Sequence, residues 1–210
     1  MIALEKSFLV QEGRFEKCRI GDFFNVGTGS LLNAKEIKSG DIKRVSVKSD
    51  NNGIIGEFNT LDVVNARHFE KFISVNFFGD VFYHDYLASV EMKVHTLHLK
   101  SGKELNKKLG LYLSSLIRKA LNNRFGYGNQ LSSSKLKEGA FYIELPMLRG
   151  QPAWDFMERY IEELEAERIE ELEAYLRVTG LNDYHLSEDE INCIKSLDIN
   201  SEICGGGGAG

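Results

Sequence analysis

Two hydrophobic patterns divide this chain into a strand-rich part and a helical part. Residues 43–48, 72–83 and 90–99 are rich in β-branched and aromatic residues, and the last segment alternates apolar with polar positions. Such alternation is typical of half-buried strands. The dipeptide Gly79-Asp80 interrupts the second segment and predicts a hairpin turn between two short strands.

A helical period replaces the alternation further along the chain. Residues 105–123 place leucine, isoleucine and alanine three or four positions apart, which predicts an amphipathic helix. A polar loop over 124–139 follows, and then an apolar strand over 140–146. Residues 1–150 are therefore predicted to form one mixed, strand-rich α+β domain.

A long helix is predicted after Gly150. Neither glycine nor a second proline interrupts the chain from Pro152 to Val178, and Gly180 suits the position just beyond a helix end. We expect this helix over 151–180, and a linker with a short helix and a glycine-rich tail over 181–210. Its apolar positions recur at nearly coiled-coil spacing and predict a stripe that contacts a partner helix. The stripe is Trp154, Met157, Ile161, Leu164, Ile169, Leu172 and Leu176.

The formal charge changes sign at the same boundary. Residues 151–210 hold four cations and 15 carboxylates, a formal charge of −11, whereas residues 1–150 hold 22 cations and 16 carboxylates, a formal charge of +6. A basic domain suits a polyanionic partner, and an acidic helix suits a protein partner.

The densest basic segment spans residues 100–137, where nine cations accompany a single acid, Glu104. Within it, the sequence RFGYGNQLSSSK over 124–135 combines residue types that bind nucleic acid. Arginine and lysine neutralise phosphates, asparagine and glutamine bond to bases, and tyrosine stacks on them. The same composition also fits a solvated loop beside a basic helix face.

Other features narrow the class of protein. The three cysteines are far apart and odd in number, which fits a reducing cytoplasm and argues against a zinc site. No apolar run approaches the roughly 20 residues of a membrane helix, and no secretory signal opens the chain. We expect a cytoplasmic protein with no membrane association, no cofactor and no catalytic set of its own.

Two alternatives remain open from the residues. Asp80 or Asp85, followed by Glu91 and Lys93, has the shape of the D…ExK metal site of many nucleases, although the pattern is short and common by chance. In the second alternative, the acidic helix is the functional surface of a protein-interaction module and the basic domain is incidental.

Four segments, taken in order, resemble one protein family. They are FEKCRIGDFFNVGTG, FISVNFFGDVFYHDYLASVEMKVHTLHLK, GYGNQLSSSKLKEGAFYIELPML and GQPAWDFMERYIEELE. The chain resembles the target recognition domain and following helix of restriction–modification specificity subunits over most of residues 14–197. The likeness is closer to the BcgI-like type IIG/IIB systems and more distant to the type I S subunits.

This resemblance implies a division of labour. The domain would read half of a split target in double-stranded DNA, the helix over 152–178 would be a spacer that pairs with the other half's helix, and a methyltransferase or nuclease–methyltransferase subunit would supply the chemistry. Loops around 27–35, 76–80 and 124–135 would face DNA. With the charge pattern, this gives a set of candidate DNA-binding residues. They are Lys35, Lys43, Arg44, Lys48, Asn76, Arg118, Lys119, Arg124, Tyr127, Asn129, Gln130, Ser132, Ser133 and Lys135.

The resemblance also implies a half-length form, because complete specificity subunits usually carry two recognition domains and two helices. The chain has one of each and ends in a glycine run, which a slipping guanine tract could encode. We therefore expect a homodimer that restores two halves. The alternative is a cloning tail or flexible tail.

Overall fold

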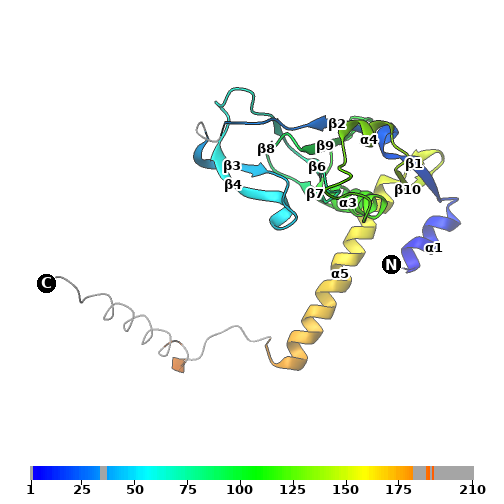
Figure 1. Ribbon diagram of the computed structural model, residues 1–210. Coiled ribbons are helices and arrows are strands. Elements are labelled where there is room, and N and C mark those ends of the chain that lie inside the picture. Colours follow the sequence, from blue (N-terminus) through cyan, green and yellow to red (C-terminus); the bar gives the residue numbers. More distant parts are fainter. Residues whose placement is uncertain (1, 34–36, 182–187, 190, 192–210) are drawn as a thin grey trace. The chain divides into compact units, whose positions relative to one another are not determined.

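The computed structural model describes residues 2–33, 37–181, 188, 189 and 191. The chain divides after Leu164 into two units. The first unit combines three β-sheets with helices (Figure 1), which confirms the prediction of a mixed α+β fold. The short helix and glycine-rich tail predicted within 181–210 fall almost entirely outside the described residues.

Two four-stranded sheets make up most of the first unit. The central sheet has the strand order β2-β9-β6-β7 and is antiparallel throughout. The distal sheet has the order β4-β3-β8-β5, in which only β3 and β8 run parallel. The central strands are β2 (Phe24–Thr28), β6 (Phe72–Asn76), β7 (Val81–His84) and β9 (Val94–Leu99). The distal strands are β3 (Lys38–Val45), β4 (Ile54–Asn59), β5 (His68–Phe69) and β8 (Ala88–Val90), and the 3-10 turn η2 (Asn51–Gly53) joins β3 to β4.

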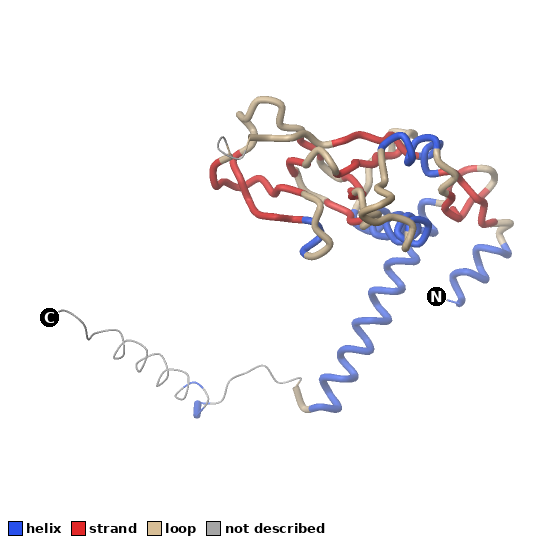
Figure 2. The backbone as a smooth tube through the Cα atoms, viewed as in Figure 1, coloured by secondary structure: helices blue, strands red, loops and turns tan. Residues whose placement is uncertain are grey.

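A terminal sheet completes the first unit with the order β1-β10-β11. Its strands are β1 (Arg14–Arg19), β10 (Tyr142–Leu148) and β11 (Gln151–Pro152). Figure 2 distinguishes the strands from the helices along the backbone. The helices are α1 (Ile2–Val10), α2 (Ile20–Phe23), α3 (Lys107–Leu121), α4 (Ser133–Glu138) and α5 (Trp154–Thr179). In the described part of the chain, no helix has both the length and the apolar content that a bilayer crossing requires.

Helix α3 covers β7 and β10 and supplies much of the main core. Its stripe of Leu109, Leu113, Ile117 and Leu121 is fully or almost fully buried. The helix begins at Lys107 because the Asn106 side chain accepts a hydrogen bond from the Leu109 amide at 2.9 Å, an ordinary N-cap. The predicted helix over 105–123 and the hairpin around Gly79 are both confirmed.

Helix α5 begins inside the first unit, and this corrects one prediction. Met157 and Ile161 belong to the main core with 0% and 8% of their surface exposed, and the Trp154 ring lies 5.9 Å from the ring of Phe23. Assigning these residues to a partner helix was wrong for Met157 and Ile161, because their own domain covers them. The helix also begins after Pro152, which lies in β11.

In the second unit, which begins at Glu165, helix α5 continues as far as Thr179 with most of its large apolar side chains exposed. Ile169 and Leu172 each expose 56% of their surface, and Leu176 is half-buried. The part of the predicted stripe that remains available to another helix is therefore Ile169, Leu172 and Leu176, while Leu164 ends the first unit half-buried.

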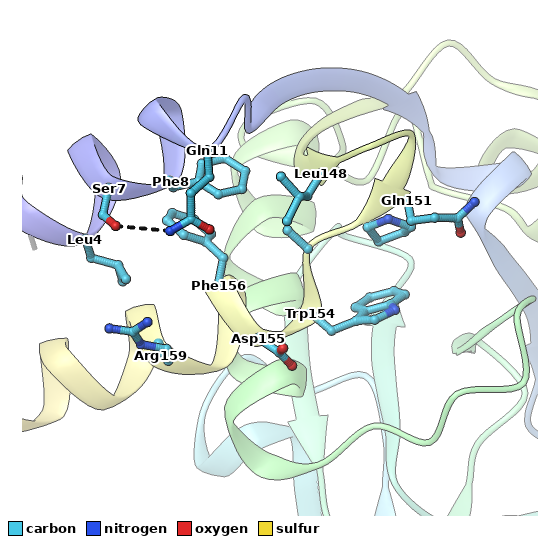
Figure 3. A pocket seen from close by; sticks show the side chains of 12 residues that line it. Leu4, Ser7, Phe8, Gln11, Leu148, Gln151, Trp154, Asp155, Phe156 and Arg159 are labelled. Atoms are coloured by element: carbon cyan, nitrogen blue, oxygen red, sulfur yellow. Dashed lines mark hydrogen bonds between the residues drawn. The ribbon is translucent and has the colours of Figure 1, made fainter.

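Helix α1 has no counterpart in the pattern-based prediction. Its Leu4 and Phe8 form a small separate core with Ala153 and Phe156, in which the rings of Phe8 and Phe156 stack at 4.2 Å. A hollow of about 420 Å³ lies between α1 and the start of α5 (Figure 3). The chain start thus stabilises the position where α5 begins.

Candidate nucleic-acid interface

The C-terminal end of α3 carries two of the predicted DNA-binding cations. Arg118 and Lys119 are exposed in its last turn, where cations interact favourably with the helix dipole. Arg118 also donates a hydrogen bond of 2.5 Å to the carbonyl oxygen of Val81 and lies over the Phe82 ring. Part of this guanidinium therefore holds α3 against β7, whereas Lys119 makes no such bond among the described interactions.

The loop after α3 is a compact turn rather than an open coil. The amides and carbonyls of Gly126 and Asn129 bond to each other at 3.1 and 3.2 Å. The side-chain nitrogen of Asn129 donates a hydrogen bond to the Arg124 carbonyl oxygen at 3.0 Å, and its side-chain oxygen accepts one from the Lys135 ammonium at 2.7 Å. Asn129 is thus engaged in holding the loop, and Tyr127 at its tip has 88% of its surface exposed.

Helix α4 lies within the predicted polar loop and orders its second half. Ser132 caps the helix by accepting a hydrogen bond from the Lys135 amide at 3.2 Å, and Leu136 anchors it in the core. Ser133 is half-buried in the first turn, and Gln130 is exposed before the cap. The capping Ser132, four residues before Leu136, was the signal for this short helix.

The predicted cations of the distal sheet have mixed environments. The Lys43 ammonium lies 4.0 Å from the centre of the Tyr86 ring, and exposed Lys48 pairs with Asp50 at 3.1 Å. Arg44 is only 3% exposed and lies 3.5 Å from Glu91, so the structure contradicts its assignment as a DNA contact. Its place in β3 turns the side chain into the protein. Lys35 lies outside the described residues.

The Asn76 side chain stabilises the β6–β7 turn, although the sequence predicted that it contacts DNA. Its side-chain oxygen accepts hydrogen bonds from the amides of Phe78 and Asp80 at 2.9 and 3.0 Å, and its amide donates to the Asp80 carboxylate at 2.8 Å. The residue is 3% exposed. Its predicted contact with a DNA base was therefore wrong, because every polar atom of the side chain holds the β6–β7 turn.

The nuclease alternative finds no support in the geometry of its residues. Glu91 bonds to Ser46 and pairs with Arg44, whereas Asp80 bonds to Asn76 and to Ser49 at 2.7 Å. Both carboxylates are thus engaged by neighbouring protein groups, and across the described ranges no group of three or more His, Cys, Asp or Glu side chains that could hold a metal ion is found.

Two histidines, His84 of the central sheet and His68 of the distal sheet, make hydrogen bonds within the protein. The ring of His84 bonds to the Ser74 hydroxyl at 2.8 Å and to the Tyr86 hydroxyl at 2.9 Å. Burial lowers the pKa of His84 to about 4, so the ring is neutral near pH 7. His68 bonds to Thr60 at 2.9 Å, and burial together with the charge of Arg44 lowers its pKa.

The candidates after α3 lie in a loop that packs beside the β6–β7 turn. The loop from Arg124 to Leu131 lies beside the β6–β7 turn, since the Leu131 amide donates to the Phe77 carbonyl oxygen at 2.8 Å. Tyr127 contacts Phe78 with 5.1 Å between ring centres. The family resemblance implied that the 76–80 turn faces DNA, but its two phenylalanines were not among the candidates, because their half-buried place on the turn is decided only by the tertiary fold.

Comparisons with known proteins place these features in a family. The family model described as type I restriction modification DNA specificity domain matches residues 12–174. The chain is 28% identical over 178 residues to the type II restriction enzyme BgcI specificity subunit S.BcgI of Heyndrickxia coagulans. That match covers 77% of this chain and 50% of the relative.

Solved structures share the fold at low sequence identity. The S subunit of a type I restriction–modification system from M. genitalium matches with a TM-score of 0.52 and 17% identity, covering 85% of this chain and 48% of that chain. The HsdS subunit from Thermoanaerobacter tengcongensis matches with a TM-score of 0.51 and 8% identity, covering 94% and 51%. The chain thus spans about half the length of the relatives that it matches. Because the family model covers well over half of the chain, this protein belongs to the family of type I restriction modification DNA specificity domains.

Proposed function

We propose that the first unit recognises a DNA sequence and that the chain directs a separate methyltransferase or nuclease–methyltransferase subunit to half of a split target. The chain itself does not catalyse the reaction. It matches half the length of relatives that are named specificity subunits. In this proposal, the chain contributes one recognition domain and one helix that sets the distance to the other half-site.

The observation that supports DNA binding most directly is the loop surface around Tyr127. Residues 122–137 contain no acid, and Arg124, Lys135 and exposed Gln130 lie in that segment. Cations of this kind neutralise phosphates, and a glutamine side chain can bond to a base edge.

We further propose that a second copy of the chain recognises the other half-site. Ile169, Leu172 and Leu176 follow three- and four-residue spacing on α5, and the first two are more than half exposed. The same helix carries eight glutamates between residues 158 and 173, so two copies repel each other while the apolar stripe attracts them.

The test uses a pool of duplexes about 30 base pairs long with a randomised centre. Repeated selection by the full chain is expected to enrich one sequence, and the logarithm of the binding constant is expected to fall linearly with the logarithm of salt concentration. Lys119→Ala is expected to reduce that slope by about 0.9, since one phosphate contact is lost. Lys6→Ala, which removes an exposed cation of α1, is the matched control and leaves the slope unchanged. Failure to enrich any sequence, or binding indifferent to salt, refutes the proposal.

A further inference from the structure

Three aromatic rings form an outward-facing group between the β6–β7 turn and the loop after α3. The rings of Phe77 and Phe78 lie 4.1 Å apart, and Phe78 meets Tyr127 edge-on at 5.1 Å. Both phenylalanines are half-buried, and Tyr127 is 88% exposed. None of the three belongs to the hydrophobic cores of the described residues. Their packing therefore does little to hold the domain together.

The two loops that carry these rings are held in place. Asn76 fixes the turn with three hydrogen bonds, and Gly79 adopts a left-handed conformation at φ +89° that permits it. A hydrogen bond from the Leu131 amide to the Phe77 carbonyl oxygen joins the turn to the other loop. Tyr127 lies at the tip of the doubly bonded turn between Gly126 and Asn129. Because hydrogen bonds already order both loops, binding of a ligand to this group costs little additional loop entropy.

One cation contacts the aromatic group, because the Lys93 ammonium lies 5.1 Å from the centre of the Phe77 ring. Arg124 and Lys135 belong to the segment after α3 that carries Tyr127, where they lie over the rings of Phe141 and Phe125. The carboxylate in the turn, Asp80, is engaged by Asn76 and Ser49. An exposed tyrosine ring with cations in the same segment suits a partner that offers both flat π faces and negative charge, which is the chemistry of nucleic-acid bases and phosphates.

We propose that Tyr127, supported by Phe77 and Phe78, stacks on a DNA base and opens one base step of the bound duplex. This inference rests on the proposed DNA recognition and adds to it a deformation of the DNA. Side chains that insert between base pairs kink the duplex and make its deformability part of the recognition. The ring supplies stacking, and the tyrosine hydroxyl is not required.

Binding by matched variants tests the stacking with the duplex pool recovered after selection. Tyr127→Ala is expected to weaken binding about five- to 150-fold, the range measured for loss of one base–aromatic stack. Tyr127→Phe retains the ring and is expected to bind within about twofold of the parent chain. Val10→Ala, which removes an exposed apolar side chain of α1, is the control and leaves affinity unchanged. The salt slope stays the same in all three, because no cation is removed.

Cross-linking locates the ring. In the same pool with thymine replaced by 5-iodouracil, irradiation is expected to join the DNA to the peptide that contains Tyr127 or to the one that contains Phe77 and Phe78. Duplex binding with cross-links only elsewhere, or with full affinity in Tyr127→Ala, overturns the stacking while leaving DNA recognition intact. If Tyr127→Ala instead weakens binding only to a methyltransferase subunit, the aromatic group is a protein-docking surface and the inference is wrong. Failure to recover any enriched duplex refutes both the stacking and the proposed DNA recognition.

Discussion

Truncation of Met157, compared with truncation of Leu172, tests which apolar residues of helix α5 belong to the core and which contact a partner. Met157 is fully buried in the main core, together with residues of α3 and of the central and terminal sheets. Met157→Ala removes three heavy atoms from a site with no exposed surface, and such truncations cost about 2–5 kcal/mol of the free energy of unfolding. Leu172→Ala is the matched control. More than half of the Leu172 surface is already exposed, so the expected change in the monomer is within about 0.5 kcal/mol.

Urea unfolding at low micromolar concentration, followed by circular dichroism in the far and near ultraviolet, measures both variants. Met157→Ala is expected to lower the midpoint whatever the protein concentration, because the lost contacts lie within one chain. Leu172→Ala is expected to leave the low-concentration midpoint in place and to weaken self-association in sedimentation experiments.

The opposite pattern refutes the reasoning. If Met157→Ala costs less than about 1 kcal/mol, its side chain is not a closely packed part of the core. If the effect of Met157→Ala grows with protein concentration, as expected for an interface residue, then Met157 contacts a partner helix as the sequence pattern predicted.

Three further predictions concern the turn, a buried histidine and the helix. Asn76→Ala leaves two amides of the β6–β7 turn without their acceptor and is expected to lower the free energy of unfolding by about 1–3 kcal/mol. Thermal or urea unfolding measures this change, and an unchanged stability contradicts the role of Asn76 in holding the turn. His84 has a folded-state pKa of about 4, below its ordinary value, so the unfolded state binds the proton first and stability falls as pH drops from about 6.5 to about 4. The loss is on the order of 3 kcal/mol, and His84→Gln is expected to flatten that part of the profile. Added salt is expected to strengthen self-association through α5 while it weakens DNA binding, and Leu172→Glu is expected to abolish the former alone in sedimentation and anisotropy measurements.

Local patterns predicted the elements whose residues repeat at a clear period. The stripe from Leu109 to Leu121 predicted α3, and the β-rich segments on either side of Gly79 predicted the β6–β7 hairpin. The same rules missed α1, because its apolar residues show no one-sided pattern, and α4, because a six-residue helix is too short for a period to emerge.

Candidate sites were predicted less well than elements, since residue type does not reveal direction. Arg44 and Asn76 have suitable chemistry for DNA, yet one lies inward beside Glu91 and the other clamps a turn. Tyr127 and Lys119 remain on the surface, where the proposed interface requires them.

The sequence by itself determined the change of charge along the chain, the mixed fold and the long helix, because composition and hydrophobic period are properties of the chain in order. Only the tertiary structure decided where the domain ends. Met157 and Ile161 belong to the same apolar stripe as Ile169 and Leu172, which resumes after a five-residue step from Leu164 to Ile169, and the residue types on the two sides of that step are alike. The difference arises because α3 and the sheets cover the first half of α5, so that the first two side chains are buried and the later two remain exposed.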